Sequence, residues 1–238
     1  MHDKSISVVL PVYNEEDNIR DVVKAAFDFL PSITGNFEII TVDDGSTDKT
    51  PQILKALEVS DSRLKIIRHP RNEGYGAALA AGFKKAEKEL ILMMDADRQF
   101  DISELSKFLL YINDYDTIAG FRLKRKDSIY RCLLGRLGSF CINILFGICM
   151  KDIKCGFKLF KAKVFKKMFL SVKSKGGGIN IEIMAFTKTN HLRLKEVGVH
   201  HYSRIHGKQT GASLKSVARG ILDALRLKGQ LIFGGGKY

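Results

Sequence analysis

The chain has 238 residues, of which 45% are hydrophobic and 27% are charged. This length suits one large domain or at most two small ones, and the composition excludes a fibrous or intrinsically disordered protein. The four cysteines are spaced too irregularly for a zinc site and include no Cys-x-x-Cys pair. Together with the lack of a recognisable signal peptide, this predicts reduced thiols in a cytosolic protein.

The formal net charge of +13 is distributed unevenly along the chain. Residues 1–121 carry 14 Lys and Arg against 21 Asp and Glu, a net −7, whereas residues 122–238 carry 25 against 5, a net +20. This asymmetry predicts an acidic site in the first half and a basic surface in the second. A basic surface attracts nucleic acid, anionic lipid or phosphorylated substrates, and charge alone does not distinguish them.

The first half alternates short apolar runs with amphipathic ones. We expect strands at residues 5–12, 37–42, 64–68 and 90–94, and helices at residues 16–30, about 48–59, 75–87 and 102–111. This order predicts an α/β fold with a mainly parallel central sheet and helices on both faces. In such a sheet, ligands bind outside the carboxyl ends of the strands.

The second half is less regular and contains two helical candidates. Residues 128–150 are apolar, but Arg131 and Arg136 interrupt them, so we expect core or interfacial helices and no membrane span. A C-terminal helix has one apolar face, composed of Leu214, Val217, Ile221 and Leu225. It is also basic, so it either lies against an anionic membrane or docks on its own domain. We see no domain boundary and expect a single domain over residues 1–238, in which residues from about 211 to 238 are this helix and a tail.

Three of the predicted strands are followed by acidic segments. These segments are Pro11-Val12-Tyr13-Asn14-Glu15, Asp43-Asp44-Gly45-Ser46 and Asp95-Ala96-Asp97-Arg98-Gln99. Because the carboxyl ends of parallel strands meet at one edge of a sheet, the sequence predicts a cluster of carboxylates there.

The third segment offers oxygen ligands for a hard cation. On an extended chain, Asp97 and Gln99 point the same way, which favours Mg²⁺ or Mn²⁺ bridging a diphosphate, with Asp95 turned to another part of the ligand. Taken alone, an Asp-x-Asp pattern usually marks a solvated turn.

Two neighbouring motifs have simpler structural interpretations. Asp48 or Thr47 is suited to cap the next helix, which leaves the carboxylates before it available. The glycines Gly74 and Gly76 lack the third glycine of a dinucleotide-binding fingerprint and follow the wrong strand. We therefore expect them to pack the start of a helix.

In series, the three acidic segments and Asn72-Glu73-Gly74-Tyr75-Gly76 resemble the inverting family 2 glycosyltransferases of GT-A fold. The resemblance covers roughly residues 5 to 212. Within the family, the chain is most similar to the polyprenyl-phosphate branch, typified by dolichol-phosphate mannose synthase. It implies a nucleotide-sugar donor, GDP- or UDP-linked, a polyprenyl phosphate acceptor, Mg²⁺ or Mn²⁺, and a place at the cytoplasmic face of a membrane.

The resemblance also implies roles for individual residues. The donor would be bound by Pro11, Val12, Tyr13, Glu15, Asp43, Asp44, Asp95 and Ala96. The metal would be held by Asp97 and Gln99, and the catalytic set would be Asp97, Arg122 and Arg204. Arg131, Glu182 and Lys208 would contact substrate.

Two late motifs match the family with departures. Residues 152–158 resemble the acceptor-side motif, in which many relatives have serine at the position of Cys155. Residues 204–210 resemble an Arg-x-x-Gly-x-Ser-Lys loop that closes over the donor, but Gln209 and Thr210 replace its last two residues. Lys208 would then supply the cation from a neighbouring position.

A phosphate acceptor is ionised at neutral pH and needs cations more than a base. Arg122, Arg131 and Arg204 suit that task because guanidinium binds phosphate oxygens through two parallel hydrogen bonds. The expected mechanism is direct displacement with inversion, assisted by the metal.

Three alternatives remain at this point. A saccharide or protein acceptor would need a carboxylate base, for which Glu182 or Asp152 is placed. A nucleotidyltransferase is disfavoured because the segment after the first strand is acidic. A non-catalytic basic module for lipid or nucleic acid is the third, although the basic residues lack the interleaved aromatics that single-strand binders use, so no nucleic-acid partner is expected.

Overall fold

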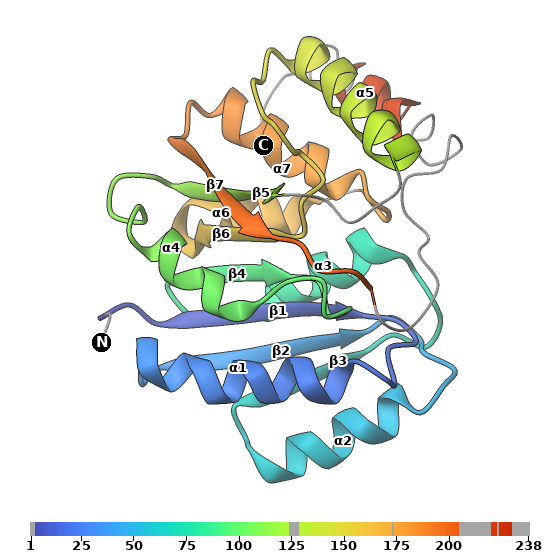
Figure 1. Cartoon of the computed structure of the whole chain (residues 1–238), viewed down its shortest axis with the longest axis vertical. Helices are drawn as coiled ribbons and strands as arrows, with labels where there is room; N and C mark the ends of the chain where they lie inside the picture. The colour runs from blue at the N-terminus through green and yellow to red at the C-terminus, as the bar shows by residue number, and fades with distance from the viewer. Residues whose placement is uncertain (1–2, 124–128, 173, 205–219, 223, 230–238) are drawn as a thin grey trace.

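A computed structural model describes residues 3–123, 129–172, 174–204, 220–222 and 224–229. Within them, seven strands form one sheet of order β3-β2-β1-β4-β6-β5-β7 (Figure 1). The strands are β1 (Ile6–Val12), β2 (Phe37–Asp43), β3 (Leu64–Arg68), β4 (Leu90–Met94), β5 (Thr117–Leu123), β6 (Phe157–Lys161) and β7 (Leu194–His200). The helices are α1 (Ile19–Ile33), α2 (Thr50–Ser60), α3 (Tyr75–Lys85), the 3₁₀ turn η1 (Ile102–Glu104), α4 (Leu105–Leu109), α5 (Ile129–Phe146), α6 (Ala162–Ser171) and α7 (Ile179–Thr189).

Only β6 runs against the other described strands, and this brings its first residues to the functional edge. β1 pairs in parallel with β2 and β4, and β5 pairs in parallel with β7. β6 is antiparallel to both β4 and β5, with Phe157 opposite Met94. The segment that precedes β6 therefore lies beside the carboxyl ends of β4 and β5.

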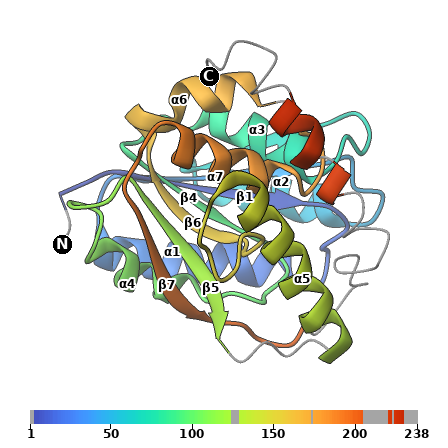
Figure 2. The same ribbon diagram turned by 90° about the horizontal axis from the view of Figure 1, so that it is seen from above.

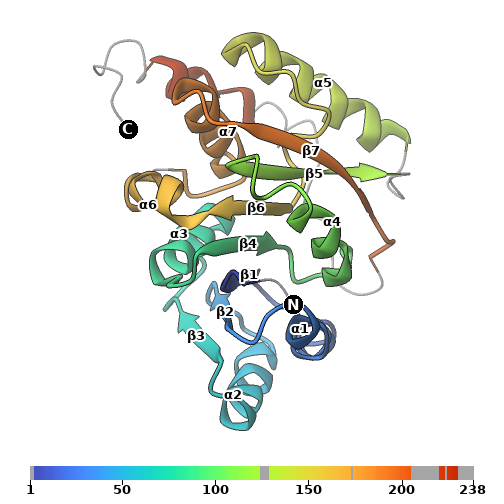
Figure 3. The same ribbon diagram turned by 90° about the vertical axis from the view of Figure 1, so that its left-hand side faces the viewer.

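The core lies on both faces of the sheet, as the α/β prediction requires. Side chains alternate between faces along each strand, so that Val8, Ile39 and Leu92 belong to one buried cluster. Their neighbours Val9 and Met93 belong to the other. Figure 3 shows α1 and α4 on one side of the sheet and α3 and α6 on the other.

The predicted elements of the first half are confirmed, with shifted ends. The strands at 64–68 and 90–94 have the expected bounds. The helix expected at 16–30 begins at Ile19 and continues past Pro31, because a proline in the last turn removes only one helical hydrogen bond. The helix expected at 102–111 is wrong as a single element, since a 3₁₀ turn precedes the short α4.

The described part of the C-terminal helix packs on its own domain, and of the predicted apolar face Ile221 is half-buried. Ala224 is fully buried among residues of α5 and α7, and Lys228 Nζ donates to Leu145 O at 2.6 Å. Leu225, on the predicted apolar face, is 51% exposed. Leu214 and Val217 lie outside the described residues. Figure 2 shows this segment beside α5.

None of the described helices is both long enough and apolar enough to cross a bilayer.

Candidate active site at the carboxyl ends of the strands

The acidic residues predicted from the sequence meet at one edge of the sheet. Pro11 and Val12 are the last residues of β1, Asp43 ends β2, and Asp95 follows β4 directly. The loop between α5 and β6 adds the segment from Asp152 to Gly156, because antiparallel β6 begins beside the carboxyl ends of β4 and β5. Motifs that are far apart in sequence are therefore neighbours in the fold.

Arg204 joins the first and third acidic segments. Its Nη2 donates to Glu15 Oε1, and its Nη1 lies 3.4 Å from Asp97 Oδ2. The other Glu15 oxygen accepts from Asn18 Nδ2 at 2.6 Å. Three predicted site residues, Glu15, Asp97 and Arg204, thus form one ion-pair network in which a guanidinium lies between two carboxylates.

The segment after β4 is a turn, so the extended-chain argument for its metal ligands is wrong. Arg98 has a φ of 63°, in the left-handed region, and Asp97 Oδ1 accepts a hydrogen bond from Gln99 N at 3.1 Å. An Asp side chain that bonds the backbone two residues ahead stabilises such a turn. Gln99 Nε2 donates to Tyr202 O at 3.1 Å, and this hydrogen bond fixes the orientation of the side-chain amide.

Burial disfavours the ionised form of the carboxylates at this edge of the sheet. It raises the pKa of Asp95 to about 7, with the negative charge of Asp97 as the next cause. Burial likewise raises the pKa of Asp97 and of Glu15, against the lowering effect of Arg204 on both. A second cation brought to this edge would relieve the repulsion between Asp95 and Asp97.

The donor set fits a hard divalent cation that is held jointly with a substrate. Among the described residues, no group of three or more His, Cys, Asp and Glu side chains forms a complete metal cage. Mg²⁺ seldom uses one, because it is commonly bound by one or two carboxylates together with substrate phosphates. Asp97 and Gln99 supply oxygen ligands of that kind, and after burial the charge of Asp97 is the next cause that raises the pKa of Asp95, so a cation at Asp97 would act against that repulsion.

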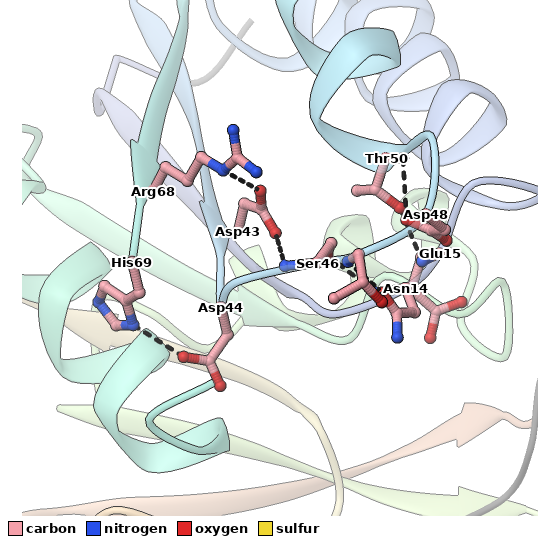
Figure 4. Close-up of polar contacts among 10 residues, drawn as sticks. Asn14, Glu15, Asp43, Asp44, Ser46, Asp48, Thr50, Arg68 and His69 are labelled. Atoms are coloured by element: carbon pink, nitrogen blue, oxygen red, sulfur yellow. Dashed lines mark hydrogen bonds and ion pairs between the residues drawn. The ribbon is translucent and has the colours of Figure 1, made fainter. Parts of the chain in front are cut away.

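The two aspartates at the end of β2 have different surroundings (Figure 4). Asp44 accepts from His69 Nδ1 at 2.8 Å and from the backbone N–H groups of Glu73 and Gly74 at 2.9 and 2.8 Å. Asp43 Oδ1 accepts from Ser46 N at 2.8 Å. Asp44 therefore organises the loop before α3, whereas Asp43 Oδ2 lies 3.2 Å from Arg68 Nε in β3. Asp43 is the better candidate for contact with a nucleoside because backbone N–H groups bind only one of its oxygens.

The loops after β1 and β2 brace each other. Asn14 N donates to Ser46 Oγ at 2.9 Å, and Glu15 N donates to Thr50 Oγ1 at 2.9 Å. Asp48 accepts from Thr50 N, the first residue of α2, and from Glu16 N. The expectation that Asp48 or Thr47 is the N-cap is wrong, because the N-cap residue is Lys49 and makes no side-chain cap hydrogen bond, but Asp48 does accept from the first residue of the helix and also holds the β1 loop in place.

The glycines before and in α3 allow another segment to approach. A Cβ at Gly76 would lie 2.1 Å from Ser174 O, and Gly76 N donates to Lys175 O at 2.8 Å. Gly74 has a φ of 104°. The prediction that these glycines pack the start of the helix is confirmed, and their packing partner is the loop before α7.

At the same edge, Arg122 and Asp152 form a bidentate ion pair. Arg122 Nε and Nη2 donate to the two oxygens of Asp152 at 2.6 and 2.9 Å. Arg122 lies near the carboxyl end of β5, and Asp152 lies in the loop before β6. Such bidentate pairs fix the plane of a guanidinium, so Asp152 orients Arg122.

The remaining predicted residues are placed as follows. Tyr13 is 44% exposed after β1, whereas Ala96 is buried in the core. Glu182 is buried in α7, where its Oε2 accepts from Ser174 N at 3.1 Å. The side chain of Arg131, within α5, and the whole of Lys208 lie outside the described part of the chain.

Sequence reasoning missed three residues of the site. Tyr75, the first residue of α3, donates its hydroxyl to Asp95 Oδ1 at 2.7 Å. Lys158 in β6 and Asn180 in α7 are buried and bonded to each other. The available signal was the lone lysine inside the apolar run from Phe157 to Phe160.

Comparisons with known proteins agree with this geometry. The family described as "Glycosyl transferase family 2" matches residues 7–171, and the chain belongs to that family. Its fold is the GT-A fold of nucleotide-sugar transferases. Solved structures of glucosyl-3-phosphoglycerate synthase from Mycobacterium tuberculosis, one with Mn²⁺, UDP and glucosyl-3-phosphoglycerate, superpose with a TM-score of 0.71 at 19% identity, covering 95% of this chain and 80% of that one.

Curated relatives are similar to this chain over most of its length. The undecaprenyl-phosphate 4-deoxy-4-formamido-L-arabinose transferase of Edwardsiella ictaluri is 31% identical over 214 residues, which are 89% of this chain and 64% of the relative. The enzyme of that name from Pseudomonas aeruginosa is 28% identical over 88% of this chain and 61% of its own length. The chain thus spans a little under two thirds of the relatives it matches.

Proposed function

We propose that the chain transfers a sugar from a nucleoside-diphosphate sugar to a polyprenyl phosphate, with inversion and with the help of Mg²⁺ or Mn²⁺. The observation that carries the proposal is the convergence of Glu15, Asp97 and Arg204 beside the Arg122–Asp152 ion pair. One cluster suits a nucleotide diphosphate with its cation, and the other suits an anionic acceptor. The relatives named as undecaprenyl-phosphate transferases support the acceptor class.

The residues of the chain divide the work of this reaction. Asp43 and the loop from Pro11 to Glu15 bind the nucleoside, and Asp97 with Gln99 holds the cation against the diphosphate. When bound, that cation neutralises charge on the diphosphate as it leaves. Arg122, held in plane by Asp152, places the acceptor phosphate against the repulsion of the donor.

The bond changes balance without a general base. An ionised phosphate oxygen attacks the anomeric carbon, a glycosidic bond to phosphate forms, and the bond from carbon to the diphosphate oxygen breaks with its electron pair. The two carboxylates considered as bases for a saccharide acceptor hold other groups. Asp152 pairs with Arg122, and Glu182 accepts from Ser174 N. This arrangement supports the phosphate acceptor over the saccharide or protein alternative.

The proposal is tested by transfer to a short-chain polyprenyl phosphate from a panel of radiolabelled UDP- and GDP-sugars with Mg²⁺ or Mn²⁺. We expect lipid-extractable product with at least one donor, and none in the presence of a chelator. Donor hydrolysis without lipid product would overturn the acceptor assignment. Failure to bind any nucleotide with either metal would overturn the transferase proposal itself, and leave the non-catalytic basic module.

We also propose that the protein meets an anionic membrane through α5. Four large apolar side chains on one face of that helix are more than half exposed: Leu133, Leu137, Phe140 and Ile144. Leu222 and Leu225 of the adjoining C-terminal helix are exposed as well. The half of the chain that contains both helices carries the net charge of +20, which favours an anionic bilayer as the occupant of this surface.

Replacing Leu137 and Phe140 with glutamate is expected to weaken vesicle binding at least about tenfold, because each side chain loses its burial in the bilayer. Co-sedimentation with phosphatidylcholine vesicles, with and without phosphatidylglycerol, measures this. The matched control replaces Val59 in α2 and Leu110 just after α4, which are 80% and 76% exposed, with glutamate. Equal loss in both double variants would show a charge effect only and contradict the α5 surface. A dimer in sedimentation velocity that the α5 variant breaks would assign the surface to a second copy instead.

A further inference from the structure

Lys158 is a fully buried lysine whose ammonium lies behind the active site. It is the second residue of β6, opposite Met93 of β4 and Ala119 of β5, and its side chain is 0% exposed. Burying an amino group costs several kcal/mol unless its protons are bonded, and an apolar residue of similar volume avoids that cost. A lysine at this position therefore needs a reason beyond packing.

The ammonium holds two different parts of the site. Lys158 Nζ donates to Asn180 Oδ1 at 2.5 Å and to the carbonyl oxygen of Cys155. Cys155 lies in the loop that also carries Asp152, the partner of Arg122. One contact thus fixes the acceptor-side loop from behind, and the other leads into α7.

From α7 buried polar side chains continue to the donor side. Burial raises the pKa of Tyr75, and the side chain of Asn180, itself 3% exposed, acts to lower it, so the two side chains lie close together. Tyr75 in turn donates to Asp95 Oδ1 at 2.7 Å. Lys158, Asn180, Tyr75 and Asp95 thus form one buried polar row, in which Lys158 donates to Asn180 and Tyr75 donates to Asp95, and polar contacts in such a row strengthen one another.

The far oxygen of Asp95 is confined too. A Cβ at Gly156 would lie 2.0 Å from Asp95 Oδ2, so the carboxylate rests against the bare Cα of the acceptor-side loop. Asp95 is thereby held between Tyr75 and Gly156. The loop of residues 152–156 is therefore coupled to Asp95 in two ways. Gly156 contacts the carboxylate directly, and Lys158, which binds Cys155 O, reaches it by way of Asn180 and Tyr75.

We infer that Lys158 is a positioning residue that sets the Asp95 carboxylate and the loop of residues 152–156 in register through Asn180 and Tyr75. This inference rests on the proposed function, because it assigns the network to donor binding. Lys158 itself touches no substrate. Its effect reaches the nucleotide through Asp95 and reaches the acceptor through the loop that orients Arg122.

A double-mutant cycle of Lys158→Met and Tyr75→Phe tests the inference. The probes are UDP and GDP, each with Mn²⁺, measured by isothermal titration calorimetry. We expect each single variant to weaken nucleotide binding about tenfold, and the double variant to be little weaker than either one, because both disrupt the same buried polar row. Lys158 and Tyr75 share no direct hydrogen bond, but both act on the Asp95 carboxylate, so non-additivity shows that they are coupled and the Asn180→Asp variant tests whether the coupling passes through Asn180.

Two further variants keep the test decisive. Lys161→Met removes the ammonium that pairs with Asp116 at the other end of β6 and is expected to leave binding unchanged. Asn180→Asp is isosteric and keeps a partner for Lys158, but it replaces the amide N–H near Tyr75 with an acceptor that competes for the hydroxyl. If Lys158→Met fails to fold, loss of nucleotide affinity in a folded Asn180→Asp protein still supports the coupling through Asn180.

The outcomes separate the inference from the function on which it rests. If the native chain binds neither nucleotide, the proposed function fails. If the native chain binds and Lys158→Met or Asn180→Asp binds equally well, the inference fails while the function stands. Full additivity of Lys158→Met and Tyr75→Phe would also overturn the coupling, because it would show two independent effects.

Discussion

Asp97→Asn is expected to lower the rate of sugar transfer at least about 10²-fold and to remove the part of nucleotide binding that depends on Mn²⁺. The change keeps the shape of the side chain and the oxygen that accepts from Gln99 N. It removes the negative charge that a hard cation requires. Transfer to polyprenyl phosphate and calorimetric titration of UDP and GDP, with and without Mn²⁺, measure both effects.

Loss of the fold does not explain this expected loss of activity. Asp97 is a source of repulsion for its neighbours, because its charge helps to raise the pKa of both Asp95 and Glu15. The neutral variant is therefore expected to unfold at the same temperature as the native chain or at a higher one. The control is Asp21→Asn, which removes a carboxylate of α1 that is 54% exposed. Metal-dependent binding that survives in Asp97→Asn would contradict the assigned cation site.

Most of the strands that sequence reasoning found have a single, buried environment, although the half-buried edge strand β3 was found as well. β1, β2 and β4 are buried on both faces and read as continuous apolar runs, which are recognisable without any structure. β6 carries Lys158 in its interior, and β7 is an edge strand of half-buried residues with Lys195 and Glu196 at its middle. Their charges hide the strand pattern, because in each case a specific tertiary contact makes the charge acceptable.

The sequence predicted which residues belong to the site better than it predicted the contacts between them. Strand ends and the family resemblance both select Glu15, Asp97 and Arg204, but nothing in their spacing places a guanidinium between the two carboxylates across 189 residues. The distinction between Asp43 and Asp44 was likewise hidden. It depends on the backbone N–H groups of Glu73 and Gly74, whose direction is set by the folded loop.

Asp95→Asn is expected to stabilise the protein at pH 8 and to have little effect on stability at pH 4. Burial raises the pKa of Asp95 to about 7, against an ordinary value of 3.8. Between these values the folded chain binds a proton that the unfolded chain has released, so stability falls as pH rises from about 4 to 7 and stays low above that. Asparagine has no proton to lose and still accepts from the Tyr75 hydroxyl, so the free energy of unfolding of the variant does not fall as pH rises through this range.

The gain at pH 8 is expected to be on the order of 4 kcal/mol, which raises Tm by roughly ten degrees in a chain of this size. Thermal unfolding at a series of pH values measures it. Asp116→Asn is the control of opposite sign. Burial acts to raise the pKa of Asp116, but Arg193 and Lys161 outweigh it and the net shift is downward.

Asp116 therefore contributes stability that is present above its ordinary pKa and is lost as pH falls through the lowered folded value. Its removal is expected to destabilise the protein at pH 8 and to have little effect in acid. If Asp95→Asn behaves like Asp116→Asn, then Asp95 is ionised and well solvated in the folded chain, and the buried network behind it does not hold it as described. If the gain at pH 8 comes with weaker nucleotide binding, the same carboxylate lowers the stability of the folded chain and serves its function.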